Sequence, residues 1–242
     1  MKRIYSIIVL LLFPWLIFAQ SPLKWDYPIK PGSEAWKALK NSSERQAACQ
    51  MNASLLKSLA TEDLVYICIE HPFFRSYIVY DSPTEGFQWS VGQFNGFNEL
   101  ISRPDAMKSL TKVYLKEDFG KMKTMSDSSK MGAYSLKCIG LELIMTNDRL
   151  LNQLSAQEKV KFLKDYYGKF LEKQQYQAVF GGIAKATTAL ISHKLIKSLD
   201  YKALKDVTKW RSADLFKEKL IVQEEGLVND LLANLTDFVQ KN

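Results

Sequence analysis

The chain has 242 residues, of which 47% are hydrophobic and 24% carry a charge, and its formal net charge at pH 7 is +7. That apolar fraction is typical of a folded domain with a buried core, so the composition excludes an intrinsically disordered chain. The lysines behind the positive charge are spread along the sequence and do not cluster in one segment. This distribution argues against nucleic acid as a partner.

The first nineteen residues differ in kind from the rest. Residues 1–3 give a basic start, residues 4–18 are apolar apart from Ser6 and Pro14, and Ala19 offers a small residue for cleavage. This pattern predicts a secretory signal peptide over residues 1–19. The apolar run is shorter than the ~20 residues that span a bilayer, so we expect an exported protein, periplasmic or extracellular, with no stable membrane span after cleavage. Cleavage would leave 31 basic and 26 acidic side chains, a net charge of about +5.

Residues 20–32 form a leader that contains three prolines. Proline fixes its own backbone and removes an amide donor, so this density predicts an extended segment and not a helix. Trp25, Tyr27 and Ile29 alternate along the leader. We expect it to lie across the outside of a helical domain with these side chains in a groove, and a mobile arm is the alternative.

Several helix starts carry recognisable caps. Three segments match the capping box, in which a serine is followed three residues later by Glu or Gln: Ser43–Gln46, Ser82–Glu85 and Ser155–Glu158. In the second of these, a proline also occupies the first helical position, where its missing amide has no cost. Ser33 and Asn52 are the expected caps of two further short helices.

Residues 61–114 concentrate aromatic and aliphatic side chains at helical spacing and predict five short helices in series. We expect Thr61 to cap the first of them, and Pro72 to end it at His71, because the residue before a proline avoids helical geometry. Helices below ~12 residues are marginal in isolation. Their aromatic side chains should therefore pack on one another, and Ile78 is an apolar residue of the second of these helices.

Trp89 is the one ring in this stretch that does not follow the apolar stripe. It falls two residues after Phe87 and two residues before Val91, which belong to that stripe. Aromatic rings at helical spacing usually serve only as core, and that interpretation stands for the others. An exposed Trp89 would instead belong to a surface that binds a partner. We name Trp89 as the candidate binding residue.

The cysteine count is odd: Cys49, Cys68 and Cys138. In an oxidising compartment, Cys49 and Cys68 could pair and leave one free thiol. All three lie among apolar neighbours, however, where a buried thiol behaves as a small hydrophobic side chain. We therefore expect three unpaired cysteines in the core.

Several segments of the first half carry a resemblance: WDYPIKPG at 25–32, AACQ at 47–50, LATEDLV at 59–65 and FNGFNELISRPD at 94–105. In these segments and in its signal sequence, the chain resembles a family of uncharacterised secreted all-helical proteins from Bacteroidota. The resemblance is one of pattern and covers roughly residues 20–115. It implies a bacterial exported protein with a helical fold, and it implies no activity and no functional residue.

The second half of the chain is more polar and more regular. Residues 116–130 form a polar joint between an aromatic-rich half, 33–119, and an amphipathic half, 130–242, which pack as one domain or as two subdomains. Gly181-Gly182 interrupts an apolar stripe, and close helix packing is the expected reason. One last helix is expected from about Ala213 to Val239.

No segment shows the alternation of a strand, so the expected fold is all-α. We expect an irregular array of short helices, solenoid-like or a bundle, with a longer C-terminal helix.

Catalytic patterns are absent from the sequence. His71 and His193 are the only histidines, and neither has a second ligand at metal-binding spacing. We interpret His71 as a helix-end residue whose partial charge suits the carbonyl end. No motif predicts a cofactor or a catalytic residue.

The leading hypothesis is therefore a binding or scaffold module that holds a protein or peptide in the cell envelope. Two alternatives remain open. One is a hydrolase or lyase whose site assembles only in three dimensions, with Glu70, His71 and Asp81 as candidates. The other is a carrier that holds a hydrophobic ligand inside the helical bundle.

Overall fold

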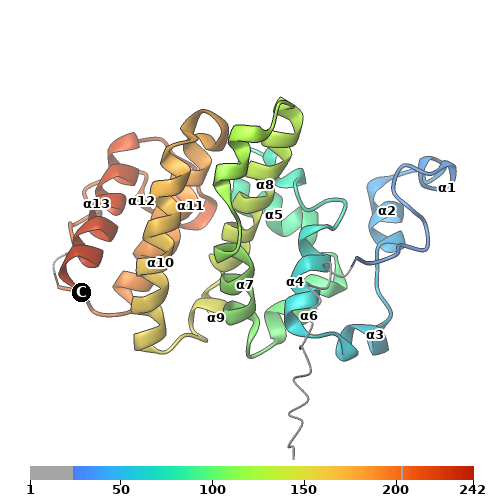
Figure 1. The fold of residues 1–242 in the computed structure, drawn as a ribbon, viewed down its shortest axis with the longest axis horizontal. Helices are drawn as coiled ribbons and strands as arrows, with labels where there is room; N and C mark the ends of the chain where they lie inside the picture. Colours follow the sequence, from blue (N-terminus) through green and yellow to red (C-terminus); the bar gives the residue numbers. More distant parts are fainter. Residues whose placement is uncertain (1–23, 203) are drawn as a thin grey trace, which may run out of the picture.

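The computed structural model describes residues 24–202 and 204–242, and all regular structure within them is helical. The expected all-α array is confirmed. The helices follow one another along the long axis of the molecule, with α1 to α3 at one end and α12 and α13 at the other (Figure 1). The predicted signal peptide, residues 1–19, lies outside the described residues.

The N-terminal end contains three short helices: α1 (Glu34–Lys37), α2 (Ser42–Ala48) and α3 (Ala53–Ser58). The side chains of Ser33 and Asn52 accept hydrogen bonds from the first turns of α1 and α3, as predicted. The prediction of a capping box at Ser43–Gln46 is wrong. Asn41 caps α2 instead, because its side-chain oxygen accepts a hydrogen bond from the Glu44 amide at 2.9 Å.

The leader is docked, as expected, over the part that the structure describes. Trp25, Tyr27 and Ile29 are half-buried, whereas the residues between them are exposed. Trp25 packs against the hydrophobic core. Tyr27 meets the ring of His71 edge-on, with 6.4 Å between the ring centroids.

The central stretch holds five short helices, as predicted: α4 (Thr61–Ile69), the 3₁₀ helix η1 (Ser76–Val79), α5 (Pro83–Val91), α6 (Asn95–Ser102) and α7 (Ala106–Leu115). Thr61 is not a cap but the first residue of α4, and its hydroxyl donates to Asp105 Oδ1 at 2.8 Å. The Ser82 cap is confirmed, because its hydroxyl accepts from the amide of Glu85 at 3.2 Å. The Glu85 side chain pairs with Lys219 instead of returning to Ser82.

The rings of this stretch pack on one another, as expected. Phe74, Phe87 and Phe97 form a triangle in which the ring centroids lie 5.7, 5.9 and 6.0 Å apart. Ile78, an apolar residue of the second helix, is instead 50% exposed. The reason is that η1 is a short 3₁₀ helix with about three residues per turn, so Tyr77 points inward and its neighbour Ile78 lies on another side.

Arg103 joins α3 to the end of α6. Its guanidinium donates to the carbonyls of Leu56 at 2.5 Å and Leu59 at 2.6 Å, and pairs with Glu99 at 3.1 Å.

A lysine at position 103 cannot make these contacts together, because its single ammonium lacks the forked set of donors of a guanidinium. We expect Arg103→Lys to lower the free energy of unfolding by about 1.5–3 kcal/mol in urea titrations. The exposed Arg149→Lys serves as the control and should change it by less than about 0.5 kcal/mol; equal losses would contradict this role.

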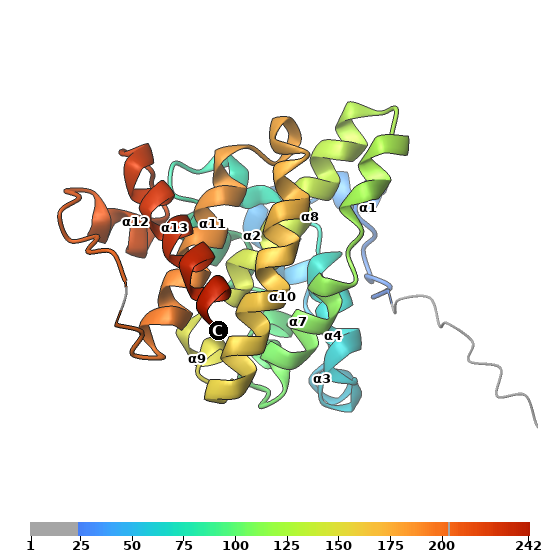
Figure 2. The same ribbon diagram turned by 60° about the vertical axis from the view of Figure 1, so that its left-hand side comes forward.

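The second half contains the longer helices: η2 (Phe119–Thr124), α8 (Ser128–Met145), α9 (Asp148–Leu151), α10 (Ala156–Gln174), α11 (Gln177–Lys197), α12 (Ala213–Lys219) and α13 (Glu225–Lys241). Helix α11 is central and packs against α8, α10 and α13 (Figure 2). The capping box at Ser155–Glu158 is confirmed in both directions.

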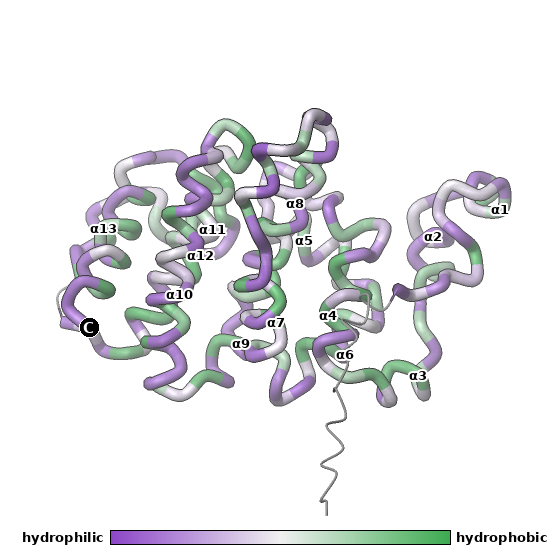
Figure 3. The backbone as a smooth tube through the Cα atoms, viewed as in Figure 1, coloured by the Kyte–Doolittle hydropathy of each residue, from purple (hydrophilic) through white to green (hydrophobic). Residues whose placement is uncertain are grey.

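The polar joint between the two halves is anchored in the core. Phe119 is fully buried in η2, and its ring lies 5.2 Å from that of Phe180 in α11 and 6.3 Å from that of Tyr114 in α7. Buried side chains of both halves therefore belong to one continuous core. Hydrophobic and hydrophilic residues alternate every few positions along α10 and α13, as expected for helices with one buried face (Figure 3). Among the described residues, no helix is long and apolar enough to cross a bilayer.

Two expectations for the second half are wrong. The helix expected from Ala213 to Val239 is divided, because Leu220 adopts a left-handed backbone, φ 54°, that ends α12. Leu220 is nevertheless buried, so the apolar spacing continues across the break. Gly181 and Gly182 do not mark close packing, since a Cβ at either would meet nothing within 4 Å. Gly181 instead supplies a kink in α11, with φ 63°.

Candidate functional site

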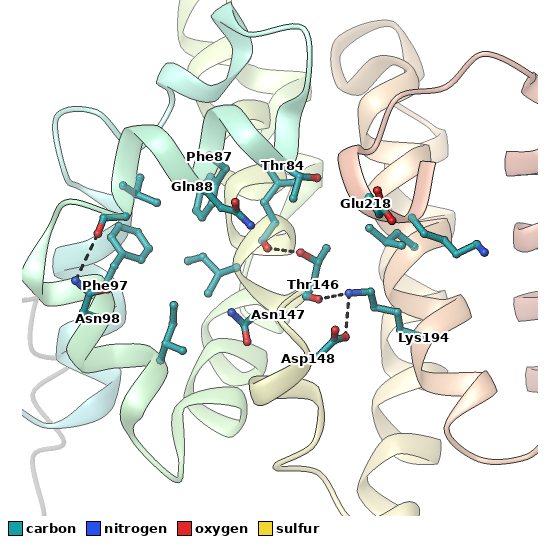
Figure 4. Close-up of a pocket in the computed structure, with 17 residues that line it drawn as sticks. Thr84, Phe87, Gln88, Phe97, Asn98, Thr146, Asn147, Asp148, Lys194 and Glu218 are labelled. Carbon is teal, nitrogen blue, oxygen red and sulfur yellow. Dashed lines mark hydrogen bonds and ion pairs between the residues drawn. The ribbon is translucent and has the colours of Figure 1, made fainter. Parts of the chain in front are cut away.

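A cleft of about 570 Å³ opens between α5 and α6 on one side and α11 and α12 on the other, with α8 at its base (Figure 4). This volume lies within the range of ~300–1,000 Å³ that is usual for small-molecule sites. The base is apolar. It is formed by buried side chains from four helices: Phe87, Val91, Phe97, Leu143, Ile144 and Leu190.

The rim of the cleft is polar and carries both signs of charge. Lys194 of α11 donates to the carbonyl of Thr146 at 2.8 Å and to Asp148 Oδ1 at 2.9 Å, which fixes α11 to the start of α9 (Figure 4). Thr84 of α5 also lines the cleft, and its hydroxyl is shielded from solvent with no hydrogen-bond partner within the described part of the chain. Gln88 is exposed on the same wall. The cleft thus combines an apolar base with hydrogen-bonding groups at its edge.

Helix α12 closes one end of the cleft by binding α5. The hydroxyl of Ser82 donates to the carbonyl of Lys219 at 2.9 Å, and the Lys219 ammonium lies 3.0 Å from the carboxylate of Glu85. These contacts use the last residue of α12, just before the left-handed turn at Leu220. The turn therefore helps to set the width of the cleft.

His71 is not the helix-end residue that we expected. Helix α4 ends at Ile69, and the His71 side chain is only 4% exposed. Its ring stacks on that of Phe94 with 4.4 Å between centroids, and its Nδ1 accepts from the Phe73 amide at 3.3 Å. Burial lowers the pKa of His71 to about 4, so the ring is neutral at pH 7.

The three candidates for an enzymatic site differ in their exposure to solvent. Glu70 and Asp81 are exposed, whereas His71 is enclosed by aromatic rings. Burial also lowers the pKa of His193 to about 4, with the lysines at 197, 217 and 194 as further causes. Both histidines are therefore uncharged in the folded protein near neutral pH.

Because both histidines are neutral in the folded protein, the free energy of unfolding should fall as the pH is lowered. Unfolded His71 takes up a proton near pH 6.5, but folded His71 does so only near pH 4. Between these values the unfolded state binds more protons, so the free energy of unfolding should fall by up to about 1.4 kcal/mol per pH unit for this group. Urea titrations at pH 7 and pH 5 measure the slope. His71→Phe, which keeps a ring against Phe94, should flatten it, and an unchanged slope would contradict the assignment.

The three cysteines are buried and unpaired, as expected. Burial raises the pKa of Cys49 to about 11 and that of Cys138 to about 12, and it holds the pKa of Cys68 well above its usual value. A thiol that stays protonated is a poor nucleophile and a poor metal ligand. Within residues 24–202 and 204–242, no three His, Cys, Asp or Glu side chains are placed to hold a metal ion.

Trp89 is 53% exposed, so the candidate binding residue lies at the surface and not in the core. It lines a different cleft, between α2 and α5. The cleft between α5 and α11 was missed by sequence reasoning because its walls come from segments far apart in the chain. The one local signal was the polar break at Thr146-Asn147-Asp148, which follows directly on the buried Leu143 and Ile144.

The chain matches no family model, no curated protein and no solved structure. The chemistry of the two clefts is therefore the basis for assigning a function.

Proposed function

We propose that this chain is an exported binding module of the cell envelope, and that the cleft between α5 and α11 holds an apolar segment of a protein or peptide. The observation that carries the proposal is the composition of this cleft. Its base presents large apolar side chains from four helices, and its rim presents hydrogen-bonding groups. Recognition of a peptide segment commonly uses this combination, with apolar anchors below and polar contacts around them.

The chemistry of the rim favours binding over catalysis. The residues that line the cleft include no histidine and no cysteine. Asp148 is paired with Lys194, and Lys217 lies 2.7 Å from Asp214. These groups are arranged as ion pairs on the surface, whereas a general acid or base needs a proton-transfer group directed at the substrate. The signal-peptide pattern of residues 1–19 supports the exported location.

The test is to select peptides from a displayed library on the purified protein and to measure their affinity by fluorescence anisotropy. Gln88→Trp places a bulky ring at the exposed edge of the cleft and should weaken binding by at least about tenfold. Gln157→Trp makes the same change at an exposed position of α10 that does not line the cleft, and affinity should stay unchanged.

Two outcomes would overturn the proposal. One is equal affinity of the selected peptides for Gln88→Trp and Gln157→Trp, which would place their binding elsewhere. The other is failure of the library to yield any specific binder while a fluorescent fatty acid binds and is excluded by Gln88→Trp. That second result would favour a carrier of a hydrophobic ligand.

A further inference from the structure

The second cleft, between α2 and α5, has a volume of about 500 Å³ and a different chemistry. Its lining residues are Ser43, Gln46, Ala47, Gln50, Trp89 and Gln93. Ser43, Gln46 and Ala47 belong to α2, where the spacing of three and four residues from Ser43 places them on one face of the helix. Gln50 follows just after the end of α2, and Trp89 and Gln93 form the other wall. Every lining side chain is uncharged. The cleft therefore offers one large aromatic ring, three amides and one hydroxyl.

The ring of Trp89 is held in place from one side. Tyr80 lies against it, with 5.5 Å between centroids and 47° between the ring planes. Gly86 makes room for this arrangement, because a Cβ there would lie 2.7 Å from the Tyr80 side chain. The indole remains 53% exposed beside the cleft. Trp89 is thus a supported, open aromatic surface.

Gln50 fixes the distance between the two walls. Its Nε2 donates to the carbonyls of Gln46 and Gln93, both at 2.9 Å, and its Oε1 accepts from the amide of Asn95 at 2.9 Å. Asn95 in turn exchanges hydrogen bonds with the backbone of Met51 at 2.7 and 3.0 Å. The amide of Gln50 is therefore used for structure, and the side chains of Gln46 and Gln93 remain to contact a ligand.

Gln46 has a polar group that a ligand could satisfy. Its Nε2 is shielded from solvent and has no hydrogen-bond partner among the residues that the structure describes. A shielded donor without a partner costs free energy, and a ligand oxygen that accepts from it would remove that cost. Each amide side chain both donates and accepts, as a sugar hydroxyl does, so amides and hydroxyls are complementary.

We propose that Trp89, Gln46 and Gln93 form a binding site for a neutral saccharide. The apolar C–H face of a pyranose ring would lie on the exposed indole, and its hydroxyls would bond to the two free amides. The absence of lysine, arginine and carboxylate side chains from the lining removes the groups that would recognise a phosphate, a uronic acid or a charged peptide. This site shares α5 with the peptide cleft but has no lining residue in common with it.

The test uses an array of neutral oligosaccharides of the gluco, manno, xylo and N-acetylglucosamine series, followed by calorimetry with the best binder. We expect binding in the millimolar range or tighter and no binding of oligogalacturonate, the acidic probe. Trp89→Ala should weaken binding by at least about tenfold, and Trp89→Phe by less, because it keeps an aromatic face. Gln46→Leu should weaken binding by about threefold or more.

The matched control is Gln157→Leu, the same substitution at an exposed position that lines neither cleft, which should leave saccharide affinity unchanged. Circular dichroism establishes that each variant is folded. Three results would overturn the proposal: no neutral oligosaccharide binds, oligogalacturonate binds as tightly as the neutral probes, or Trp89→Ala leaves affinity unchanged. Gln88→Trp, which tests the peptide cleft, should not affect saccharide binding, so the two proposals fail separately.

Discussion

Lys173→Met should lower the free energy of unfolding by about 3–5 kcal/mol, one of the largest effects that we expect from a single substitution in this chain. Lys173 of α10 is 3% exposed and forms an ion pair with the fully buried Glu142 of α8. Its ammonium also donates to the hydroxyl of Thr188 at 2.8 Å. Without Lys173, the Glu142 carboxylate would remain in the core with no opposite charge.

The remaining partners of Glu142 cannot replace the lysine. The hydroxyls of Tyr114 and Thr187 both donate to the Glu142 carboxylate. Burial and the nearby carboxylate raise the pKa of Tyr114 well above its usual value, so its hydroxyl keeps its proton and remains a donor. Both donors are uncharged hydroxyls. Their hydrogen bonds therefore do not balance the charge of a carboxylate that has been removed from water.

If the unpaired charge of Glu142 causes the loss of stability, then removing that charge should restore part of it. Adding Glu142→Gln to Lys173→Met should recover part of the lost stability, because glutamine carries no charge, its carbonyl oxygen can accept from one of the two hydroxyls and its NH2 group can donate to the other. Urea unfolding of both variants measures the difference. Lys161→Met, which removes a lysine from the exposed pair with Asp165, should cost less than about 0.5 kcal/mol. If the double variant were less stable than Lys173→Met alone, the unpaired charge would not be the cause.

This buried pair shows why part of the molecule could be predicted from sequence and part could not. A cap such as Ser82 or Ser155 acts within one turn of helix, so the pattern contains the whole interaction. Glu142 lies between two leucines, and Lys173 lies near the end of a charged helix, 31 residues later. No local spacing connects them. Their pairing follows from how α8 and α10 pack around α11.

The residues of the candidate sites also fall into two groups, those that local sequence could identify and those that it could not. The position of Trp89 off a single helical stripe is local information, and it marked this ring as the candidate for exposure. Its neighbours in the cleft, such as Gln46, come from another helix and were not predicted. The division at Leu220 was also missed, because a buried leucine continues the apolar pattern even where the backbone leaves the helix.

The second large effect is expected at Gly140, in the middle of α8. A Cβ at this position would lie 2.6 Å from Cε1 and 2.8 Å from Cζ of the Phe74 ring. Phe74 is fully buried and held between the rings of Phe87 and Phe97, so it has no free space to move into. We expect Gly140→Ala to lower the free energy of unfolding by about 1–3 kcal/mol, even though alanine favours helix.

Gly132→Ala is the matched control, because it lies on the same helix and its Cβ would meet nothing within 4 Å. It should raise the free energy of unfolding by about 0.5–1 kcal/mol through helix propensity alone. The clash itself is tested by Phe74→Leu, which shortens the obstructing side chain. In that background Gly140→Ala should cost less than in the native sequence, since the added methyl group finds space. If its cost were the same in both backgrounds, the ring of Phe74 would not be the reason that position 140 requires glycine.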